Sequence, residues 1–223
     1  MLILAIDTSG KQGSVALCRG DASSFELLGL AALEGGTYSA SLVPCIAELL
    51  QRADVTKSQI DGFVVVNGPG SFTGLRVGLS TVKAMCEVLQ KPLATVSMLE
   101  ALAITCGRDE EIVAAVLDAG RGEVYAGEYE VGGGAAKCVE DSMVKLSDFA
   151  TKAVKSRLRV FTTFPKVVDL LGAQSELVIP LSADTIARIG LRKLLAGEVA
   201  DAATLDANYI RRADAELYSP PKR

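Results

Sequence analysis

Hydrophobic and polar residues along the first third of the chain follow two different periods. Apolar runs at residues 2–6 and 14–18, joined by a glycine-containing turn, predict a β-hairpin. A weaker third strand is expected at 25–31. From residue 39 to residue 53 apolar residues recur every three or four positions, which predicts a helix. The run D-G-F-V-V-V at 61–66 predicts a buried strand, which ends at a Gly-Pro-Gly turn.

The segment 71–90 is predicted to be a helix that is polar on one narrow stripe. The polar positions are Arg76, Ser80, Lys83, Glu87 and Gln90. A helix of this kind is buried on most of its circumference. Gly70, Gly74 and Gly78 recur every fourth residue, which would let another backbone approach closely on that side. The pattern is compatible with burial in the chain's own core and with an interface to a second subunit.

The pattern of the first strands returns in the second half of the chain. A strand at 111–117 ends at Asp118, as the first strand ends at Asp7, and a glycine-containing turn and another strand follow in both places. This repetition predicts a duplicated α/β unit, with domains 1–106 and 107–223. The other expected elements are a strand at 93–96, a helix at 97–106, a strand at 123–129, a hairpin turn at 132–134, a helix at 147–156, a strand at 160–162 and a helix at 182–196.

Composition removes several kinds of chemistry. The 223 residues contain no histidine, which excludes His-ligated zinc, Ser-His-Asp and Cys-His nucleophile pairs, and imidazole acid–base catalysis. With 23 basic and 27 acidic residues the net charge is -4, so contact with nucleic acid is expected to be local or delegated to a partner. The five widely spaced cysteines predict reduced, mostly buried thiols. With no signal peptide and no apolar run of membrane-spanning length, a soluble cytoplasmic protein without membrane contact is expected.

Two segments have the chemistry of an anion site. Asp7, Thr8 and Ser9 place a carboxylate and two hydroxyl groups at a strand end, although an Asp in this position commonly stabilises its own turn. The run N-G-P-G-S-F-T-G-L-R-V-G at 67–78 leads from glycines into a helix N-terminus, where unpaired amides and the helix dipole attract anions. This run lacks the Gly-Lys-Ser/Thr of a Walker A loop.

Four motifs in order along nearly the whole chain together resemble the TsaB (YeaZ) family. They are I-L-A-I-D-T-S at 3–9, G-P-G-S-F-T-G-L-R-V-G-L-S at 68–80, D-A-G-R-G-E-V-Y at 118–125 and A-N-Y-I-R-R at 207–212. The resemblance implies an α/β fold with two subdomains, the duplicated actin-like, Hsp70-like ATPase (RNase H-like) fold. It also implies a non-catalytic scaffold subunit of the bacterial machinery that installs threonylcarbamoyl on the tRNA adenosine next to the anticodon.

The same resemblance implies the partners. The expected partners are a TsaD-type transferase, a paralogue that forms a heterodimer with the chain, and a TsaE-type ATPase in a larger complex; tRNA is met only through that complex. A homodimer of the isolated chain stays open. Dimerisation is expected on the helices at 39–53 and 71–90, with candidates Leu42, Ile46, Leu49, Leu75, Arg76, Leu79, Val82, Lys83 and Cys86. Periodicity does not divide the residues that face a partner from those that face the chain's own sheet.

The chain departs from its catalytic relatives at two places. Met98 and Leu102 stand where the TsaD paralogue carries the two histidines of its metal-binding H-x-x-G-H, with Ala101 at the glycine, so no metal is expected. The segment V-F-T-T-F-P at 160–165 has no glycine where actin-like ATPases hold adenosine. No cofactor is therefore expected, and the residues that remain form a vestigial phosphate loop of Asp7, Thr8, Ser9, Gly68, Gly70 and Ser71.

Two further differences separate the chain from other TsaB sequences. Tyr38 stands where most members have a histidine at the start of the first long helix. Gly120 stands at the usual arginine of D-A-R-x-G-E-V-Y, which leaves open whether Arg121 substitutes for that arginine.

Other functions stay under consideration. An ATPase or small-molecule kinase of the same fold would use Asp7 to position magnesium and Asp118 to hold water. A glycoprotease-type metallopeptidase is disfavoured by the absence of histidine. The basic C-terminal tail either is solvated or contacts tRNA or an acidic partner surface; its residues are Tyr209, Arg211, Arg212, Lys222 and Arg223.

Overall fold

A computed structural model describes residues 1–206 of the chain as two compact α/β units. The first unit comprises Met1–Ala101 together with the segment that begins at Pro180, and the second unit comprises Leu102–Ile179. The predicted boundary near residue 106 lies close to the observed one. The prediction of one continuous second domain, 107–223, was wrong, because the chain returns to the first unit at Pro180.

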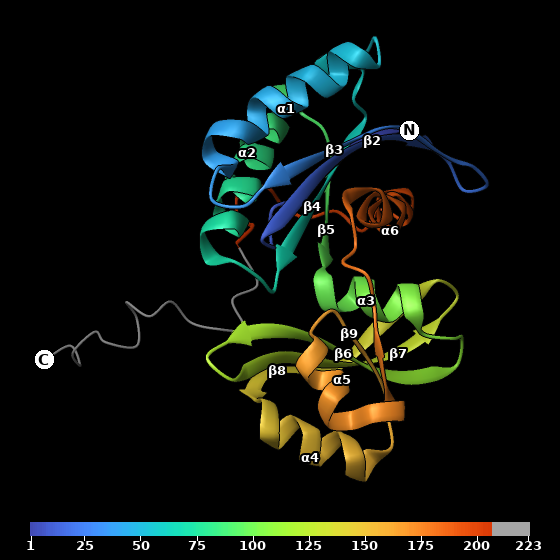
Figure 1. The fold of residues 1–223 in the computed structure, drawn as a ribbon. Helices are drawn as coiled ribbons and strands as arrows, with labels where there is room; N and C mark the ends of the chain where they lie inside the picture. The colour runs from blue at the N-terminus through green and yellow to red at the C-terminus, as the bar shows by residue number, and fades with distance from the viewer. Residues whose placement is uncertain (207–223) are drawn as a thin grey trace, which may run out of the picture. The chain divides into compact units, whose positions relative to one another are not determined.

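The first unit contains one five-stranded sheet with helices on both faces (Figure 1). Its elements are β1 (Leu2–Asp7), β2 (Gln12–Gly20), β3 (Phe25–Glu34), α1 (Tyr38–Arg52), η1 (Lys57–Gln59), β4 (Gly62–Gly68), α2 (Phe72–Leu89), β5 (Leu93–Ser97), the beginning of α3 (Met98–Cys106) and α6 (Ala183–Leu195). The strand order is β3-β2-β1-β4-β5. β1 pairs antiparallel with β2 and parallel with β4, and all six of its residues are buried. A strand covered on both faces reads as a continuous apolar run, which explains L-I-L-A-I at the start of the sequence.

Successive residues of β2 show which helix covers which face. Because side chains alternate across a strand, Gly13 and Ser14 point to opposite faces. A methyl group at Gly13 would lie 2.9 Å from the Tyr38 ring of α1, whereas the Ser14 hydroxyl accepts a 2.8 Å hydrogen bond from the backbone N–H of Ala183, in α6. Helix α1 therefore covers one face and α6 the other, and Figure 1 shows α2 on the side of α1.

The second unit repeats this arrangement. Its elements are β6 (Glu111–Gly120), β7 (Glu123–Gly132), β8 (Ala135–Lys145), α4 (Leu146–Ser156), β9 (Arg159–Thr162), α5 (Pro165–Leu171), η2 (Gly172–Gln174) and β10 (Ser175–Leu177). The sheet order β8-β7-β6-β9-β10 matches that of the first sheet strand for strand, with an antiparallel pair before the central strand and a parallel pair after it. A core that includes Phe149, Val160 and Val167 joins this sheet to α4 and α5.

These two sheets confirm the duplicated α/β fold that the repeated strand-Asp-turn-strand pattern predicts. The predicted helices and strands are present with ends shifted by up to three residues, and the Gly132–Gly134 turn joins β7 to β8. Three elements were not predicted from the sequence: α5, β10 and β8, the strand after the predicted turn. Helix α5 and strand β10 have only seven and three residues, so neither develops a hydrophobic period, and most residues of β8 are exposed.

Candidate functional site

The carboxylate at the end of β1 is engaged by its own turn. Asp7 is 3% exposed, and its Oδ1 accepts hydrogen bonds from the Ser9 backbone N–H at 2.8 Å and from the Ser9 hydroxyl at 2.6 Å. Burial raises the pKa of Asp7 above its usual value, while the two hydrogen bonds from Ser9 lower it. The group is therefore a turn-stabilising acid with little contact with solvent.

The glycines of α2 bring this turn against the helix. The Thr8 hydroxyl donates a 2.8 Å hydrogen bond to the Gly74 carbonyl oxygen, and the Ser71 N–H donates one of 2.7 Å to the Ser9 carbonyl oxygen. A methyl group at Gly70 or Gly74 would overlap the backbone of the turn, and one at Gly78 would overlap the Thr8 hydroxyl. The predicted close approach is therefore made by this chain's own first turn.

The start of α2 is capped from within the chain. The Ser71 hydroxyl accepts a 3.3 Å hydrogen bond from the Gly74 N–H, the interaction expected of an N-cap serine. Of the six residues predicted to form a phosphate loop, the structure brings together Asp7, Thr8, Ser9, Gly70 and Ser71. Gly68 instead pairs with Ser97 at the ends of β4 and β5. Their role in phosphate binding stays a prediction.

Tyr38 fills the space beside the first turn. The side chain is buried, its hydroxyl donates a 3.0 Å hydrogen bond to the Gly10 carbonyl oxygen, and its ring lies within 3.3 Å of the position that a methyl group on Gly74 would take. Burial raises the pKa of the Tyr38 hydroxyl, and the nearby charge of Asp7 raises it further. The structure thus gives this position a packing role that the sequence analysis left without an explanation.

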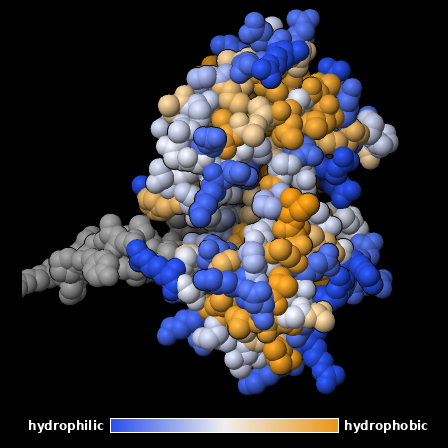
Figure 2. All heavy atoms as spheres, viewed as in Figure 1, coloured by the Kyte–Doolittle hydropathy of each residue, from blue (hydrophilic) through white to orange (hydrophobic). Residues whose placement is uncertain are grey.

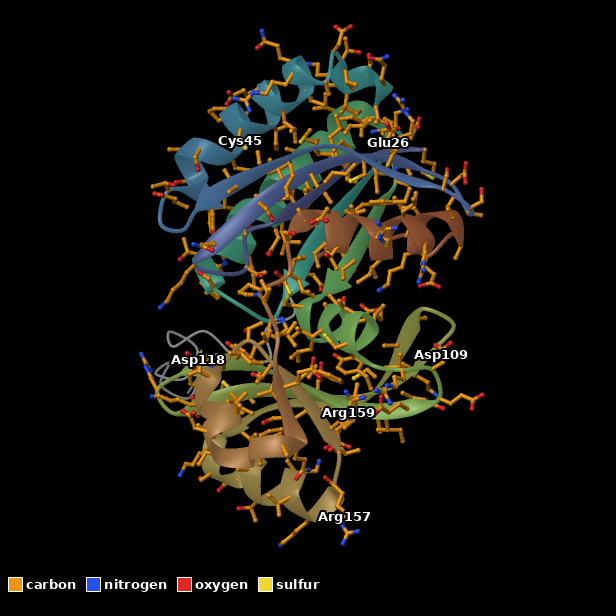
Figure 3. The ribbon with its side chains drawn as sticks, turned by 45° about the vertical axis from the view of Figure 1, so that its right-hand side comes forward. Glu26, Cys45, Asp109, Asp118, Arg157 and Arg159 are labelled. Carbon is orange, nitrogen blue, oxygen red and sulfur yellow. The ribbon has the colours of Figure 1, made fainter. Side chains whose placement is uncertain are left out.

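The turn after β6 repeats the turn after β1 in a more open form. Asp118 (Figure 3) is exposed, and its Oδ1 accepts a 2.8 Å hydrogen bond from the Gly120 N–H, two residues on, as Asp7 does from Ser9. Gly120, Arg121 and Gly122 have φ angles of 75°, 55° and 79°. Three successive left-handed residues make a tight turn, and the two glycines adopt this conformation without strain.

The segment that would hold adenosine in an actin-like ATPase is a helix cap here. Thr162 is fully buried, and its hydroxyl accepts a 3.0 Å hydrogen bond from the Phe164 N–H. Pro165 then begins α5, the position at which proline suits a helix best. The segment therefore carries a buried threonine and a helix start at the position where the resemblance to actin-like ATPases implies a glycine turn.

The residues at the paralogue's metal-ligand positions are apolar and buried. Met98 is 8% exposed, and Ala101 and Leu102 are 0% exposed. Within residues 1–206, no three histidine, cysteine, aspartate or glutamate side chains come together in a way that could hold a metal ion. A thioether and an isobutyl group do not ligate a hard cation, so the residues present do not fit a TsaD-type metal.

The two buried cysteines are poor candidates for a nucleophile. All five are free; Cys18 and Cys86 are buried, Cys45 and Cys106 are partly exposed, and Cys138 is exposed. Burial raises the pKa of Cys18 to about 12 and that of Cys86 to about 11. At neutral pH these two thiols stay protonated, which makes them weak nucleophiles.

Two polar groups at the neighbouring ends of β4 and β5 were not singled out by the sequence. The Asn67 Oδ1 and the Ser97 Oγ are buried and have no hydrogen-bond partner within the described chain. Nothing in their spacing marks them, since they lie at the ends of two different strands and are both common turn residues.

The predicted interface residues divide sharply in the structure. Seven apolar candidates are at most 5% exposed and point into the first unit; they are Leu42, Ile46, Leu49, Leu75, Leu79, Val82 and Cys86. Arg76 is exposed, with its guanidinium 3.9 Å from the Phe72 ring centre, and Lys83 is partly exposed. Besides Arg76 and Lys83, the side chains that α1 and α2 present to solvent include Val43, Ala47, Ser80, Ala84 and Val88, none of which was among the predicted contacts.

Comparison with known proteins gives a consistent result along the whole chain. Residues 36–220 match the family model described as TsaD, tRNA N6-adenosine threonylcarbamoyltransferase. The chain is 31% identical over 228 residues to tRNA threonylcarbamoyladenosine biosynthesis protein TsaB of Bacillus subtilis, a match that covers 97% of this chain and 96% of that protein. The protein of the same name from Escherichia coli is 31% identical over 134 residues, 58% of this chain and 55% of the relative.

A solved structure agrees with these matches. YeaZ from Pseudomonas aeruginosa superimposes with a TM-score of 0.76 at 25% identity, over 93% of this chain and 99% of that one. Among the described residues, none of the helices combines the length and the apolar character needed to cross a membrane.

Proposed function

The chain belongs to the TsaB family of TsaD-related proteins, and from that premise we propose that it is a non-catalytic subunit in the threonylcarbamoylation of tRNA. Its role would be to form a heterodimer with a TsaD-type transferase and to support that transferase, which modifies the adenosine next to the anticodon. A TsaE-type ATPase would join the larger complex, tRNA would be met through that complex, and the location would be the cytoplasm.

The observation that carries the proposal is the solvent face of α1 and α2. Tyr38 at the start of α1 lies beside Gly74 near the start of α2, so the two helices run side by side from their first turns. Their accessible residues are mostly small or apolar, namely Ala40, Val43, Ala47, Val77, Ser80, Thr81, Ala84 and Val88. In Figure 2 the surface over these helices, at the upper left, is mostly pale and interrupted by a few hydrophilic side chains.

This face is suited to helix-on-helix docking. Val43 is 61% exposed and Val88 is 74% exposed, although both are aliphatic residues on otherwise well-buried helices. Small side chains between them would let the helices of a partner approach closely and pack ridges into grooves. The resemblance to TsaB implies dimerisation through these two helices, and we propose their exposed residues as the contacts in place of the seven buried candidates.

Three features of the site support a non-catalytic role. The Asp7 carboxylate accepts two hydrogen bonds from Ser9, and Tyr38 occupies the space beside the first turn. Apolar residues stand at the positions of the metal ligands of the TsaD paralogue. An ATPase or kinase would need an accessible acid to position magnesium. Asp7, at 3% exposure, would have to leave its turn to do so.

Co-expression with the TsaD-type protein of the same organism tests the proposal. We expect the two chains to elute from size-exclusion chromatography as one heterodimer. Separate elution at micromolar concentrations would contradict the proposed function.

Calorimetric titration of the isolated chain with magnesium-ATP separates the proposal from the enzymatic alternative. We expect no binding in the micromolar range, because the first turn is filled by its own side chains. Micromolar binding would instead favour a nucleotide-dependent enzyme.

A further inference from the structure

The outer edge of the first sheet is a long strand without charge in its middle. β3 stands at the end of the strand order, so its backbone pairs with β2 on one side and with no strand of the described chain on the other. It has ten residues, more than the usual number of about five or six. Residues 27–33 contain neither a charged residue nor a proline. Such an edge is a template for pairing with another chain.

The edge strand at the same place in the second sheet differs in its charge. β8 stands at the end of its strand order as β3 does, and both strands contain a bulge. The middle of β8 exposes three charged residues, Lys137, Glu140 and Asp141. Charged side chains on an edge oppose pairing with a second chain. The second unit therefore has a protection that the edge of the first unit lacks.

Apolar side chains of β3 form a row on the face of the sheet that α6 covers. Ser14, which accepts a hydrogen bond from α6, lies opposite Ala32, and opposite residues point to the same face. Leu30 shares that face by alternation, and so does Leu27, because Leu28 is the extra residue of the bulge. Leu27 and Leu30 are 43% and 46% exposed. In Figure 2 hydrophobic residues gather over β2 and β3, at the upper right.

Opposite charges lie at the two ends of this row. At one end the guanidinium group of Arg188, in α6, lies 4.0 Å from the ring centre of Phe25. At the other end Glu34 is exposed. Neither Arg188 nor Glu34 forms an ion pair within the described residues. The row thus has a basic end and an acidic end, about 30 Å apart along the extended strand.

We propose that β3 is the interface of a homodimer, in which the β3 edges of two copies pair antiparallel and join two five-stranded sheets into one. In a two-fold interface the same surface of both copies must complement itself. With the two-fold axis beside Leu30, each Leu30 lies opposite Leu30 of the second copy. When the bulge is counted, Leu27 then lies opposite Ala32 of the second copy, so a large side chain meets a small one.

The charges at the ends of the row fit the same register. Phe25 lies opposite Glu34 of the second copy, so Arg188, which stacks on Phe25, faces that carboxylate. Symmetry makes this pair twice. A shift by two residues would separate both pairs by about 7 Å along the strand. A parallel arrangement would bring like charges together at each end, so the charges favour the antiparallel one.

Sedimentation equilibrium of the isolated full chain tests the proposal. Because one pair of edge strands buries less than a standard interface, the measurement should extend from about 5 µM to about 500 µM. We expect the mean mass to rise from the monomer value of 23.3 kDa towards twice that value. Leu30→Lys places two ammonium groups opposite each other and should weaken dimerisation at least about 30-fold. Val139→Lys, at a 57% exposed position of β8, should leave it unchanged.

An exchange of charges tests the register. Arg188→Glu and Glu34→Lys should each weaken dimerisation about tenfold, because each makes two attractive pairs repulsive. The double variant should recover the wild-type dissociation constant to within about threefold. Failure of the double variant to recover would contradict the antiparallel register, since two unrelated losses would add instead.

Two other results would overturn the interface itself. One is a wild-type chain that keeps the monomer mass at the highest concentration. The other is a Leu30→Lys variant that dimerises as the wild type does while Ala84→Arg, on α2, does not; the two copies would then meet through their helices. No TsaD-type protein is present in these measurements, so their outcome is independent of the proposed function.

Discussion

At the scale of single residues, two side chains decide the character of the first turn. Asp7 is kept in place by the backbone and hydroxyl groups of Ser9, and Tyr38 packs against the same turn from α1. Both side chains are buried, so their contribution is to the stability of the turn. A residue that serves as a reactive acid would need solvent or a ligand beside it.

Asp7→Asn tests the electrostatic part of this account. The amide oxygen of asparagine can accept the same two hydrogen bonds from Ser9 without carrying a buried charge. Because burial raises the folded-state pKa of Asp7, the contribution of this group to stability is largest at low pH and is lost as pH rises through that pKa. We expect Asp7→Asn to raise the Tm by at least about 2 °C at pH 7.

The same variant provides its own control in acid. Below about pH 3 Asp7 is protonated in the folded chain and mostly protonated in the unfolded chain, so the difference in Tm should become small. Thermal unfolding between about pH 2.5 and pH 8 measures both limits. A lower Tm for Asp7→Asn at pH 7 would mean that the ionised carboxylate is needed by the fold.

Substitutions at Tyr38 separate its hydroxyl from its ring. Tyr38→Phe loses the hydrogen bond to Gly10 and should reduce the free energy of unfolding by about 1 kcal/mol. Tyr38→Ala also leaves a cavity and should cost about 3–5 kcal/mol. Denaturant unfolding compares the two, and equal costs would contradict a space-filling role for the ring.

At the scale of elements, α2 is the helix on which the first unit depends. Its apolar residues face the sheet, its glycines admit the turn after β1, and its remaining face is open to solvent. One side of α2 thus packs in the core, a second side contacts the turn after β1, and a third side belongs to the proposed interface.

Gly74→Ala tests the close approach between α2 and the first turn. The added methyl group would overlap the Thr8 carbonyl oxygen, and backbone atoms on both sides leave little room for relaxation. We expect a loss of about 3 kcal/mol in the free energy of unfolding. Gly132→Ala is the matched control, since a methyl group there meets no atom within 4 Å; equal stability of the two variants would contradict the account.

The sequence was sufficient to predict the features that depend on local periodicity. It did not predict the features that depend on how distant segments pack against one another. The strand-Asp-turn-strand repeat identified the duplicated fold, and the glycine spacing identified a close approach on α2. Periodicity assigned Leu42 and Val82 to apolar faces without telling which layer covers them, and the structure shows that the chain's own core does. A hydrogen bond from the Lys83 ammonium group to the Leu205 carbonyl oxygen joins residues 122 positions apart, and no local pattern encodes such a contact.

At the scale of the whole molecule, the two units share one strand order, and the two strand-terminal aspartates share one turn geometry. The two sites have nevertheless diverged, because Asp7 is buried whereas Asp118 is exposed. In the first unit the helices on one face of the sheet also present a small-residue surface. The central claim is that this surface, on α1 and α2, binds a TsaD-type partner.

Calorimetric titration of the partner into wild type, Ala84→Arg and Ala173→Arg tests this claim most directly. Ala84 is exposed on α2, and Ala173 is an equally small, exposed residue of the second unit. We expect Ala84→Arg to weaken heterodimer formation at least about 100-fold, because a long charged side chain would prevent close helix packing. We expect Ala173→Arg to bind as the wild type does. Wild-type affinity in Ala84→Arg would contradict the account.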